Sequence, residues 1–160
     1  MHLINEEKMK INYNSDITKV ATGIIVQGVN CQRAMGSGLA KAIYTKWPIV
    51  REEFMQTEPE IGTVLCIKVA NKLWVANCYT QEFYGYDGRK YASVAAIDKC
   101  LHHVCTGFGI TKLPIHIAKI GCDLGGLDWI TEVEPIIDSY AADFDITVHE
   151  IKNERRVSGN

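Results

Sequence analysis

The sequence predicts a three-layer α/β/α sandwich around a mixed, mostly parallel β-sheet. Short apolar runs that are typical of buried strands alternate along the chain with segments of helical periodicity. Two of the strand-like runs are separated only by Asn71-Lys72, which indicates one hairpin and therefore one antiparallel pair. The other strands are joined through helices, and such connections give parallel neighbours.

The composition is that of an ordinary globular protein. With 160 residues, 47% of them hydrophobic, the chain is long enough for one domain with a substantial core. A net charge of −2 argues against a dedicated nucleic-acid surface. We expect a single domain over residues 9–151, with flexible tails at 1–8 and 152–160.

The cysteines and the N-terminus bear on the cellular compartment. The first residues carry acidic side chains and lack the apolar centre of a signal peptide, and no apolar run approaches the length of a membrane span. The six cysteines include no C-x-x-C pair, so we interpret them as free thiols in a reducing cytoplasm. We expect a monomer that needs no metal or cofactor and has no contact with a membrane.

The first half of the domain is expected to hold two strands and two helices. In chain order they are an edge strand at 10–13, a buried strand at 23–29, a helix at 37–47 and a helix at 48–56. Pro48 ends the first helix and suits the first turn of the second.

The second half adds strands on both sides of a long helix. The expected elements are strands at 62–69 and 73–79, a helix at 91–108, a strand at 113–120 and a last strand at 145–151. Asp128 can cap a helix in which Pro135 causes a kink or a later start. The loop 80–90 is rich in aromatic residues, which favours a lid or a binding wall over a bare connector; a self-packed surface loop is the alternative.

Two glycine-rich loops follow strands of this pattern. Gly36-Ser37-Gly38 leads into a helix, where free backbone N–H groups and the helix dipole favour an anion. Gly121–Leu127 follows the strand at 113–120. Both loops stand at carboxyl ends of strands, which is where open α/β sheets bind ligands, so the pair suits a diphosphate. An ordinary structural turn is the alternative for each loop.

Four motifs in order resemble those of the macro domain family. They are Ser15-Asp16-Ile17-Thr18; Gly28-Val29-Asn30-Cys31-Gln32 followed by Met35-Gly36-Ser37-Gly38-Leu39-Ala40; Tyr79-Thr80-Gln81; and Ile120-Gly121-Cys122-Asp123-Leu124-Gly125-Gly126-Leu127-Asp128-Trp129. The resemblance covers about residues 9–151 and implies the macro domain fold. The family binds ADP-ribose and often hydrolyses its derivatives.

The resemblance implies roles for particular residues. Asp16 would accept a hydrogen bond from the adenine amino group beside Ile17, unless Asp16 only caps a turn. Asn30 would hold the distal ribose, unless its side chain only braces its own loop. His149 stands about where relatives carry an aromatic residue near the adenine, and a surface histidine is the alternative. The remaining ligand-contacting positions implied are Met35, Gly36, Ser37, Gly38, Leu39, Thr80, Gly121, Cys122, Asp123, Leu124, Gly125, Gly126 and Leu127.

The same comparison of motifs argues against the lysine-dependent mechanism that some members of the family use. Lysine-dependent glycohydrolases of the family use a lysine and an aspartate at positions that here hold Gln81 and Gly125. We therefore expect no lysine mechanism, although Lys90 and Lys119 are near; we place Lys119 in a strand. Asp123 is the candidate general base, or only a loop residue that caps neighbouring N–H groups.

The predicted activity is hydrolysis at the 1″ position of the distal ribose, most specifically of ADP-ribose 1″-phosphate to ADP-ribose and phosphate. Asn30 would position the substrate for a directly attacking water, and Cys31 and Cys122 are rival nucleophiles if helix N-termini lower their pKa values. The alternatives are a reader that binds ADP-ribose without turnover and a hydrolase that removes ADP-ribose esters from modified protein.

Overall fold

The computed structural model describes residues 9–122 and 125–150. The tails predicted at 1–8 and 152–160, and the site residues Asp123 and Leu124, lie outside the described residues. The strands form a mixed sheet in the order β1-β6-β5-β2-β4-β3, in which only β3 and β4 are antiparallel. Their bounds are β1 Lys10–Tyr13, β2 Gly23–Asn30, β3 Val64–Ala70, β4 Leu73–Gln81, β5 Ile115–Ile117 and β6 Ile146–Glu150.

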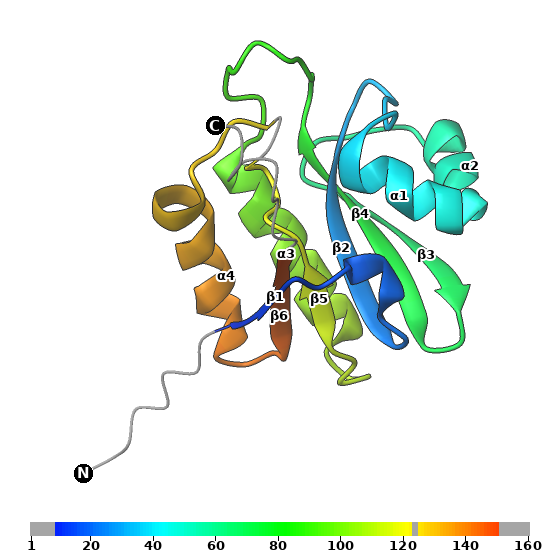
Figure 1. Ribbon diagram of the computed structural model, residues 1–160, viewed down its shortest axis with the longest axis vertical. Helices are drawn as coiled ribbons and strands as arrows, with labels where there is room; N and C mark the ends of the chain where they lie inside the picture. Colours follow the sequence, from blue (N-terminus) through cyan, green and yellow to red (C-terminus); the bar gives the residue numbers. More distant parts are fainter. Residues whose placement is uncertain (1–8, 123–124, 151–160) are drawn as a thin grey trace.

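Helices cover both faces of this sheet, which confirms the predicted three-layer α/β/α sandwich (Figure 1). On one face lie α1 (Gly38–Lys46) and α2 (Pro48–Gln56), and on the other α3 (Val94–Phe108) and α4 (Glu134–Ala141). A short 3₁₀ turn, η1 (Ile17–Lys19), precedes β2, and a π-helical turn, η2 (Trp129–Val133), precedes α4. None of the described helices has both the length and the apolar character needed to cross a membrane.

Strand β2 is the centre of the fold. Ile24 and Val26 point into the core under α3 and α4, whereas Ile25 packs into the core under α1. All three are fully buried, which explains why the strand is an unbroken apolar run rather than an alternating one. Burying each isoleucine side chain contributes about 1.5–3 kcal/mol, so the strand forms a firm base for the loop that follows it.

Most elements lie within two residues of their predicted bounds, and two differ by three residues at one end. Strand β5 is shorter than the predicted strand at 113–120, because Pro114 has no N–H to donate and the backbone curls after Ile117, where the Ile120 N–H donates to the Ala118 carbonyl at 2.7 Å. Helix α3 begins at Val94 rather than Tyr91 because Ser93 caps it, accepting from the Ala96 N–H at 3.1 Å.

Asp128 and Pro135 behave as predicted at the last helix. The Asp128 carboxylate accepts hydrogen bonds from the N–H of Thr131 at 2.9 Å and from its hydroxyl at 2.7 Å. Pro135 lies in the first turn of α4, where its missing N–H costs nothing, and the regular helix therefore starts at Glu134 after the π-helical turn.

Candidate functional site

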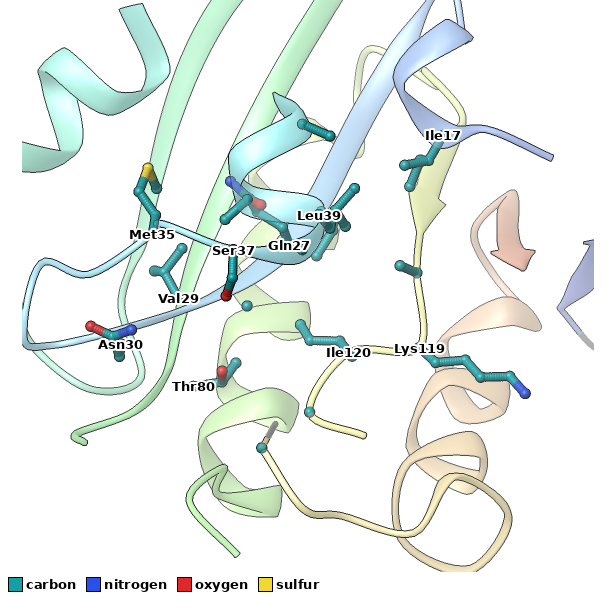
Figure 2. Close-up of a pocket in the computed structure, with 18 of the residues that line it drawn as sticks. Ile17, Gln27, Val29, Asn30, Met35, Ser37, Leu39, Thr80, Lys119 and Ile120 are labelled. Atoms are coloured by element: carbon teal, nitrogen blue, oxygen red, sulfur yellow. The ribbon is translucent and has the colours of Figure 1, made fainter. Parts of the chain in front are cut away.

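A cavity of about 630 Å³ opens at the carboxyl-terminal edge of the sheet, where β2, β4, β5 and β6 end. Figure 2 shows Ile17 of η1 toward one end of the cavity, Asn30 and Thr80 toward the other, and Ser37 between them. The four strands are mutually parallel, so their ends bring together residues that lie far apart in the sequence.

The first glycine loop supplies free N–H groups to the middle of the cavity. Ser37 is the N-cap of α1, but its side chain makes no capping hydrogen bond, and the first turn contains no acidic residue. The first hydrogen bond of the helix runs from the Lys41 N–H to the Ser37 carbonyl, which leaves the N–H groups of Gly38, Leu39 and Ala40 without helical partners. Gly36, Gly38 and Leu39 line the cavity with Ser37, so this end of α1 favours an anion.

The second glycine loop faces the cavity through two of its glycines, Gly121 and Gly125. They pack closely, since a Cβ on Gly125 would lie 2.6 Å from the Gly121 carbonyl oxygen. The Gly125 carbonyl accepts hydrogen bonds from the N–H groups of Tyr91 at 2.8 Å and Ala92 at 3.0 Å, which ties the loop to the segment that precedes α3. Three other predicted contact residues in this loop do not line the cavity: Cys122, Gly126 and Leu127.

Those three positions have structural surroundings of their own. Leu127 is buried and packs with the core under α3 and α4. Gly126 has a φ of +82°, and a Cβ there would lie 2.4 Å from the Arg89 carbonyl oxygen, so the position requires glycine for backbone reasons. The Cys122 thiol points back to the Ile120 carbonyl at 3.4 Å.

Asp16 lies at the η1 end of the cavity and does cap a turn. Its Oδ1 accepts from the Thr18 N–H at 2.9 Å and from the Thr18 hydroxyl at 2.7 Å. These bonds lower the pKa of the Asp16 carboxyl, the hydroxyl bond most strongly, so Asp16 is ionised at neutral pH. Its Oδ2 has no hydrogen bond to the described residues, and Asp16 lines the cavity next to the buried Ile17. The carboxylate therefore caps the turn and still presents an acceptor.

Asn30 is buried at the opposite end and does brace its own loop. Its Oδ1 accepts from the N–H groups of Gln32 at 3.0 Å and Ala34 at 3.1 Å, and its Nδ2 donates to the Ala34 carbonyl at 2.9 Å. Both acceptor positions of the carboxamide are occupied. One N–H of Nδ2 remains, so Asn30 can donate one hydrogen bond to a ligand but has no free lone pair to accept one.

Aromatic side chains form part of the wall beside Asn30. Tyr84 and Tyr86 line the cavity, with their rings edge to face and 6.3 Å apart. The Tyr84 N–H donates to the Gln32 side-chain carbonyl at 3.0 Å, which links this loop to the one that Asn30 braces. Tyr86 is 70% exposed, so the loop covers the cavity only partly. Met35, also predicted here, lines the cavity and is buried, and Thr80 does so at the end of β4.

His149 is buried rather than on the surface. Its Nδ1 lies 2.7 Å from the Ser15 hydroxyl, and its Nε2 lies 2.8 Å from Nδ1 of His116. Reasoning from the sequence missed His116 and the Ser15 side chain. The available signal was alternation: Ile115, Ile117 and Val148 face the core, so His116 and His149 must share the other face of neighbouring strands.

The lysines and thiols near the cavity have partners or raised pKa values. Lys119 follows β5 instead of lying in a strand, and it pairs with Glu150 at 3.2 Å. Burial raises the pKa of the Cys31 thiol and raises that of Cys122 to about 11, so the expectation of lowered thiol pKa values is wrong. Among residues 9–122 and 125–150, no three His, Cys, Asp or Glu side chains form a group that could hold a metal ion.

Both positions expected to differ from the lysine-dependent enzymes, Gln81 and Gly125, make contacts within the protein. The Gln81 amide donates to the Phe83 carbonyl at 2.7 Å, and Gly125 packs against the Gly121 backbone as described above. Lys90, on the neighbouring loop, forms an ion pair with Glu132 at 2.7 Å.

No protein-family model and no curated protein matches the chain. The fold, however, is shared with solved structures. A protein of unknown function from Bacteroides thetaiotaomicron superposes with a TM-score of 0.77 at 28% identity, over 89% of this chain and 98% of the other. The macrodomain of Mycobacterium tuberculosis DarG superposes with a TM-score of 0.72 at 21% identity, over 88% of this chain and 97% of the other. The chain has the macrodomain fold.

A third similar structure carries a ligand. Thermosipho africanus DarTG, solved in complex with ADP-ribose, superposes with a TM-score of 0.72 at 18% identity, over 88% of this chain and 41% of that longer one. At these identities the similarity establishes the macrodomain fold alone, which confirms the fold predicted from the four motifs. What this macrodomain binds has to be argued from its own cavity.

Proposed function

We propose that this macrodomain binds ADP-ribose and hydrolyses a derivative of it at the 1″ position. The observation that carries the proposal is the order of chemical groups along one cavity: an ionised carboxylate at one end, the N-terminus of α1 and the second glycine loop in the middle, and a single free amide N–H at the other end. ADP-ribose has the matching order of an amino group, a diphosphate and a ribose with free hydroxyls. A structure with the same fold, solved in complex with ADP-ribose, supports ADP-ribose as the ligand class.

The adenine belongs at the η1 end, where the free Oδ2 of Asp16 accepts from the 6-amino group and Ile17 offers an apolar contact. The diphosphate lies against Gly36, Ser37 and Gly38, where unpaired N–H groups and the helix dipole stabilise its charge. A hydrogen bond to a charged group contributes about 1.5–3 kcal/mol, so this contact supplies much of the affinity.

The distal ribose then reaches the Asn30 and Thr80 end. The remaining N–H of Asn30 donates to a ribose hydroxyl, and the three hydrogen bonds within its loop hold that N–H in place before the ligand arrives. Tyr84 and Tyr86 reduce the exposure of the 1″ position to bulk water. Positioning of this kind can supply several kcal/mol of the rate enhancement.

The specific reaction that we propose is hydrolysis of ADP-ribose 1″-phosphate by a directly attacking water. The water supplies its oxygen to the phosphoryl group, the bond between phosphorus and the 1″ oxygen breaks, and the products are phosphate and ADP-ribose. The loop N–H groups offset the charge that develops on the phosphate oxygens, which is often the largest contribution in such sites. Asp123 is the proposed base on sequence grounds alone, since it lies outside the described residues.

The test is incubation with ADP-ribose 1″-phosphate and, separately, with ADP-ribosylated protein, while phosphate and free ADP-ribose are measured independently and ADP-ribose binding is followed by calorimetry. We expect phosphate release from the first substrate. Binding without release of either product would assign the non-catalytic reader function, and ADP-ribose released only from protein would assign the ester hydrolase. Absence of ADP-ribose binding would refute the proposal.

Two variants separate the proposed roles. Asn30→Ala should lower turnover at least about tenfold, which corresponds to 1.4 kcal/mol in the barrier. The double variant Cys31→Ala, Cys122→Ala should keep most of the activity, because burial keeps both thiols protonated at neutral pH. A double cysteine variant that binds ADP-ribose normally but has no turnover would contradict the proposed attack by water. Asp123→Ala with full turnover would remove Asp123 from the mechanism.

A further inference from the structure

A chain of hydrogen bonds runs beneath the η1 end of the cavity. The Thr22 carbonyl lies 3.0 Å from Nε2 of His116, Nδ1 of His116 lies 2.8 Å from Nε2 of His149, and Nδ1 of His149 lies 2.7 Å from the Ser15 hydroxyl. Ser15 directly precedes Asp16, and Ser15, Asp16 and His149 all line the cavity. These hydrogen bonds therefore connect the Thr22 carbonyl to a hydroxyl that lines the cavity.

The first member of this chain fixes the direction of every bond in it. A carbonyl oxygen only accepts, so Nε2 of His116 carries a hydrogen. A neutral imidazole has one N–H, hence Nδ1 of His116 accepts from Nε2–H of His149, and Nδ1 of His149 accepts from the Ser15 hydroxyl. Burial lowers the pKa of both histidines, and His116 further lowers that of His149, which is consistent with two neutral rings.

The direction of these hydrogen bonds determines what Ser15 offers to a ligand. Its hydroxyl hydrogen is used by His149, and its oxygen has no other hydrogen bond to the described residues. We propose that His116 and His149 hold Ser15 as a hydrogen-bond acceptor toward the ligand, and that Ser15 is thereby a specificity residue selecting a 6-amino purine over a 6-oxo purine. The proposal rests on the proposed function, which places the adenine at this end of the cavity.

The physical basis is the cost of opposing two acceptors. The 6-amino group of adenine has two N–H donors, enough for the Ser15 oxygen and the free Oδ2 of Asp16 together. Hypoxanthine has a carbonyl oxygen at that position, so its lone pairs would oppose both protein oxygens, and acceptors that the ligand covers without pairing are costly. We expect ADP-ribose to bind at least about tenfold more tightly than inosine diphosphate ribose, a factor that corresponds to 1.4 kcal/mol.

Protonation of His116 would reverse the direction of these hydrogen bonds. If His116 gains a proton on Nδ1, that N–H donates to Nε2 of His149, whose own hydrogen then moves to Nδ1 and donates to the Ser15 oxygen. The hydroxyl hydrogen of Ser15 becomes free to donate into the cavity. The charged groups around the pair are Asp145, which pairs with Lys10 and raises the pKa of His116, the Glu150–Lys119 ion pair at the end of β6, and Asp16, which follows Ser15. Thr22 and Gly23, where β2 begins, carry no charge.

The experiment measures the affinities of ADP-ribose and inosine diphosphate ribose for four proteins by calorimetry at pH 7.5: the unaltered chain, Ser15→Ala, His116→Phe and the control His103→Phe. Phenylalanine keeps a ring in place of each imidazole, and His103 is an exposed residue of α3 outside the cavity lining. The selectivity is the dissociation constant of inosine diphosphate ribose divided by that of ADP-ribose. We expect Ser15→Ala and His116→Phe to lower this ratio at least about threefold, mainly by improving relative binding of the 6-oxo ligand. His103→Phe should leave the ratio unchanged.

A ratio that stays at the unaltered value in Ser15→Ala would overturn the inference, as would equal binding of the two ligands by the unaltered chain. A purely structural role for the histidines would weaken both ligands equally and keep the ratio. If His116→Phe does not fold, the pH arm replaces it: the ratio for the unaltered chain should fall as the histidine pair takes up a proton, and the ratio for Ser15→Ala should not. Failure of ADP-ribose to bind at all would instead refute the proposed function.

Discussion

Gly36 offers a sharp test of where the diphosphate binds. Gly36 lines the cavity at the first glycine loop, and a Cβ placed on it would meet no atom within 4 Å. The free protein therefore has room for a Cβ at this position, whereas Gly36→Val fills space that the proposed site reserves for phosphate oxygens. The loss of affinity and the stability of the variant should be independent of each other.

The magnitude follows from the contacts that the new side chain displaces. Losing one hydrogen bond from a backbone N–H to a phosphate costs about 1.5–3 kcal/mol. This loss raises the dissociation constant for ADP-ribose roughly 10- to 150-fold. Stability should stay the same or rise by up to about 1 kcal/mol, because replacing a glycine at a permissive backbone position reduces the entropy of the unfolded chain.

The matched control is Gly107→Ala on α3. A Cβ placed on Gly107 also has no atom within 4 Å, and Gly107 lies on α3 outside the cavity lining. This substitution should stabilise the protein by about 0.5–1 kcal/mol through helix propensity and leave ADP-ribose binding unchanged. Calorimetry and thermal unfolding of both variants are the assays, and wild-type affinity in Gly36→Val would refute the placement of the diphosphate.

Three further predictions test other parts of the site. Asp16→Asn keeps an oxygen for the turn but loses the charged acceptor, so ADP-ribose binding should weaken by about 1–3 kcal/mol in calorimetry with little change in melting temperature, and unchanged affinity would count against the adenine placement. Borohydride trapping followed by mass spectrometry should find no ADP-ribose adduct on Lys90 or Lys119, since both are ion-paired. Because the folded-state pKa values of His116 and His149 are lowered, their neutral forms stabilise the fold above about pH 6.5, and denaturant titrations should show that stability falling as the pH drops from there through the folded pKa values, with a smaller slope in His116→Phe.

The sequence predicted elements best where the local signals agreed with the tertiary structure. Helix α2 has the predicted bounds because Pro48 fixes its first turn and the apolar residues Val50 and Phe54 repeat at helical spacing. The strand predicted at 113–120 was too long because its apolar residues continue past Ile117 for a different purpose: Ala118 and Ile120 line the cavity. Hydrophobicity marks both situations, so the pattern alone does not separate them.

The sequence indicated candidate site residues but not their hydrogen bonds. Asp16, Ser37 and Asn30 all line the cavity, and their contacts with a ligand stay a prediction. The hydrogen bonds that leave Asn30 with one free N–H depend on the path of residues 30–34, which no residue spacing specifies. The pairing of His116 with His149 required knowing that β5 and β6 are neighbours, and this is a property of the whole sheet.

The two halves of β2 show how the fold supports such a site. Its first half, through Ile24, Ile25 and Val26, is buried on both faces and anchors the strand. Its second half contains Gly28, where a Cβ would lie 2.8 Å from the Thr80 hydroxyl oxygen and 3.0 Å from Ile120 Cγ1, so any side chain would crowd the cavity wall. A glycine inside a strand costs about 0.5–1 kcal/mol. That cost is smaller than the burial of even one of the preceding isoleucines, and for this reason the strand can remain rigid where it holds the fold and leave space where it meets the ligand.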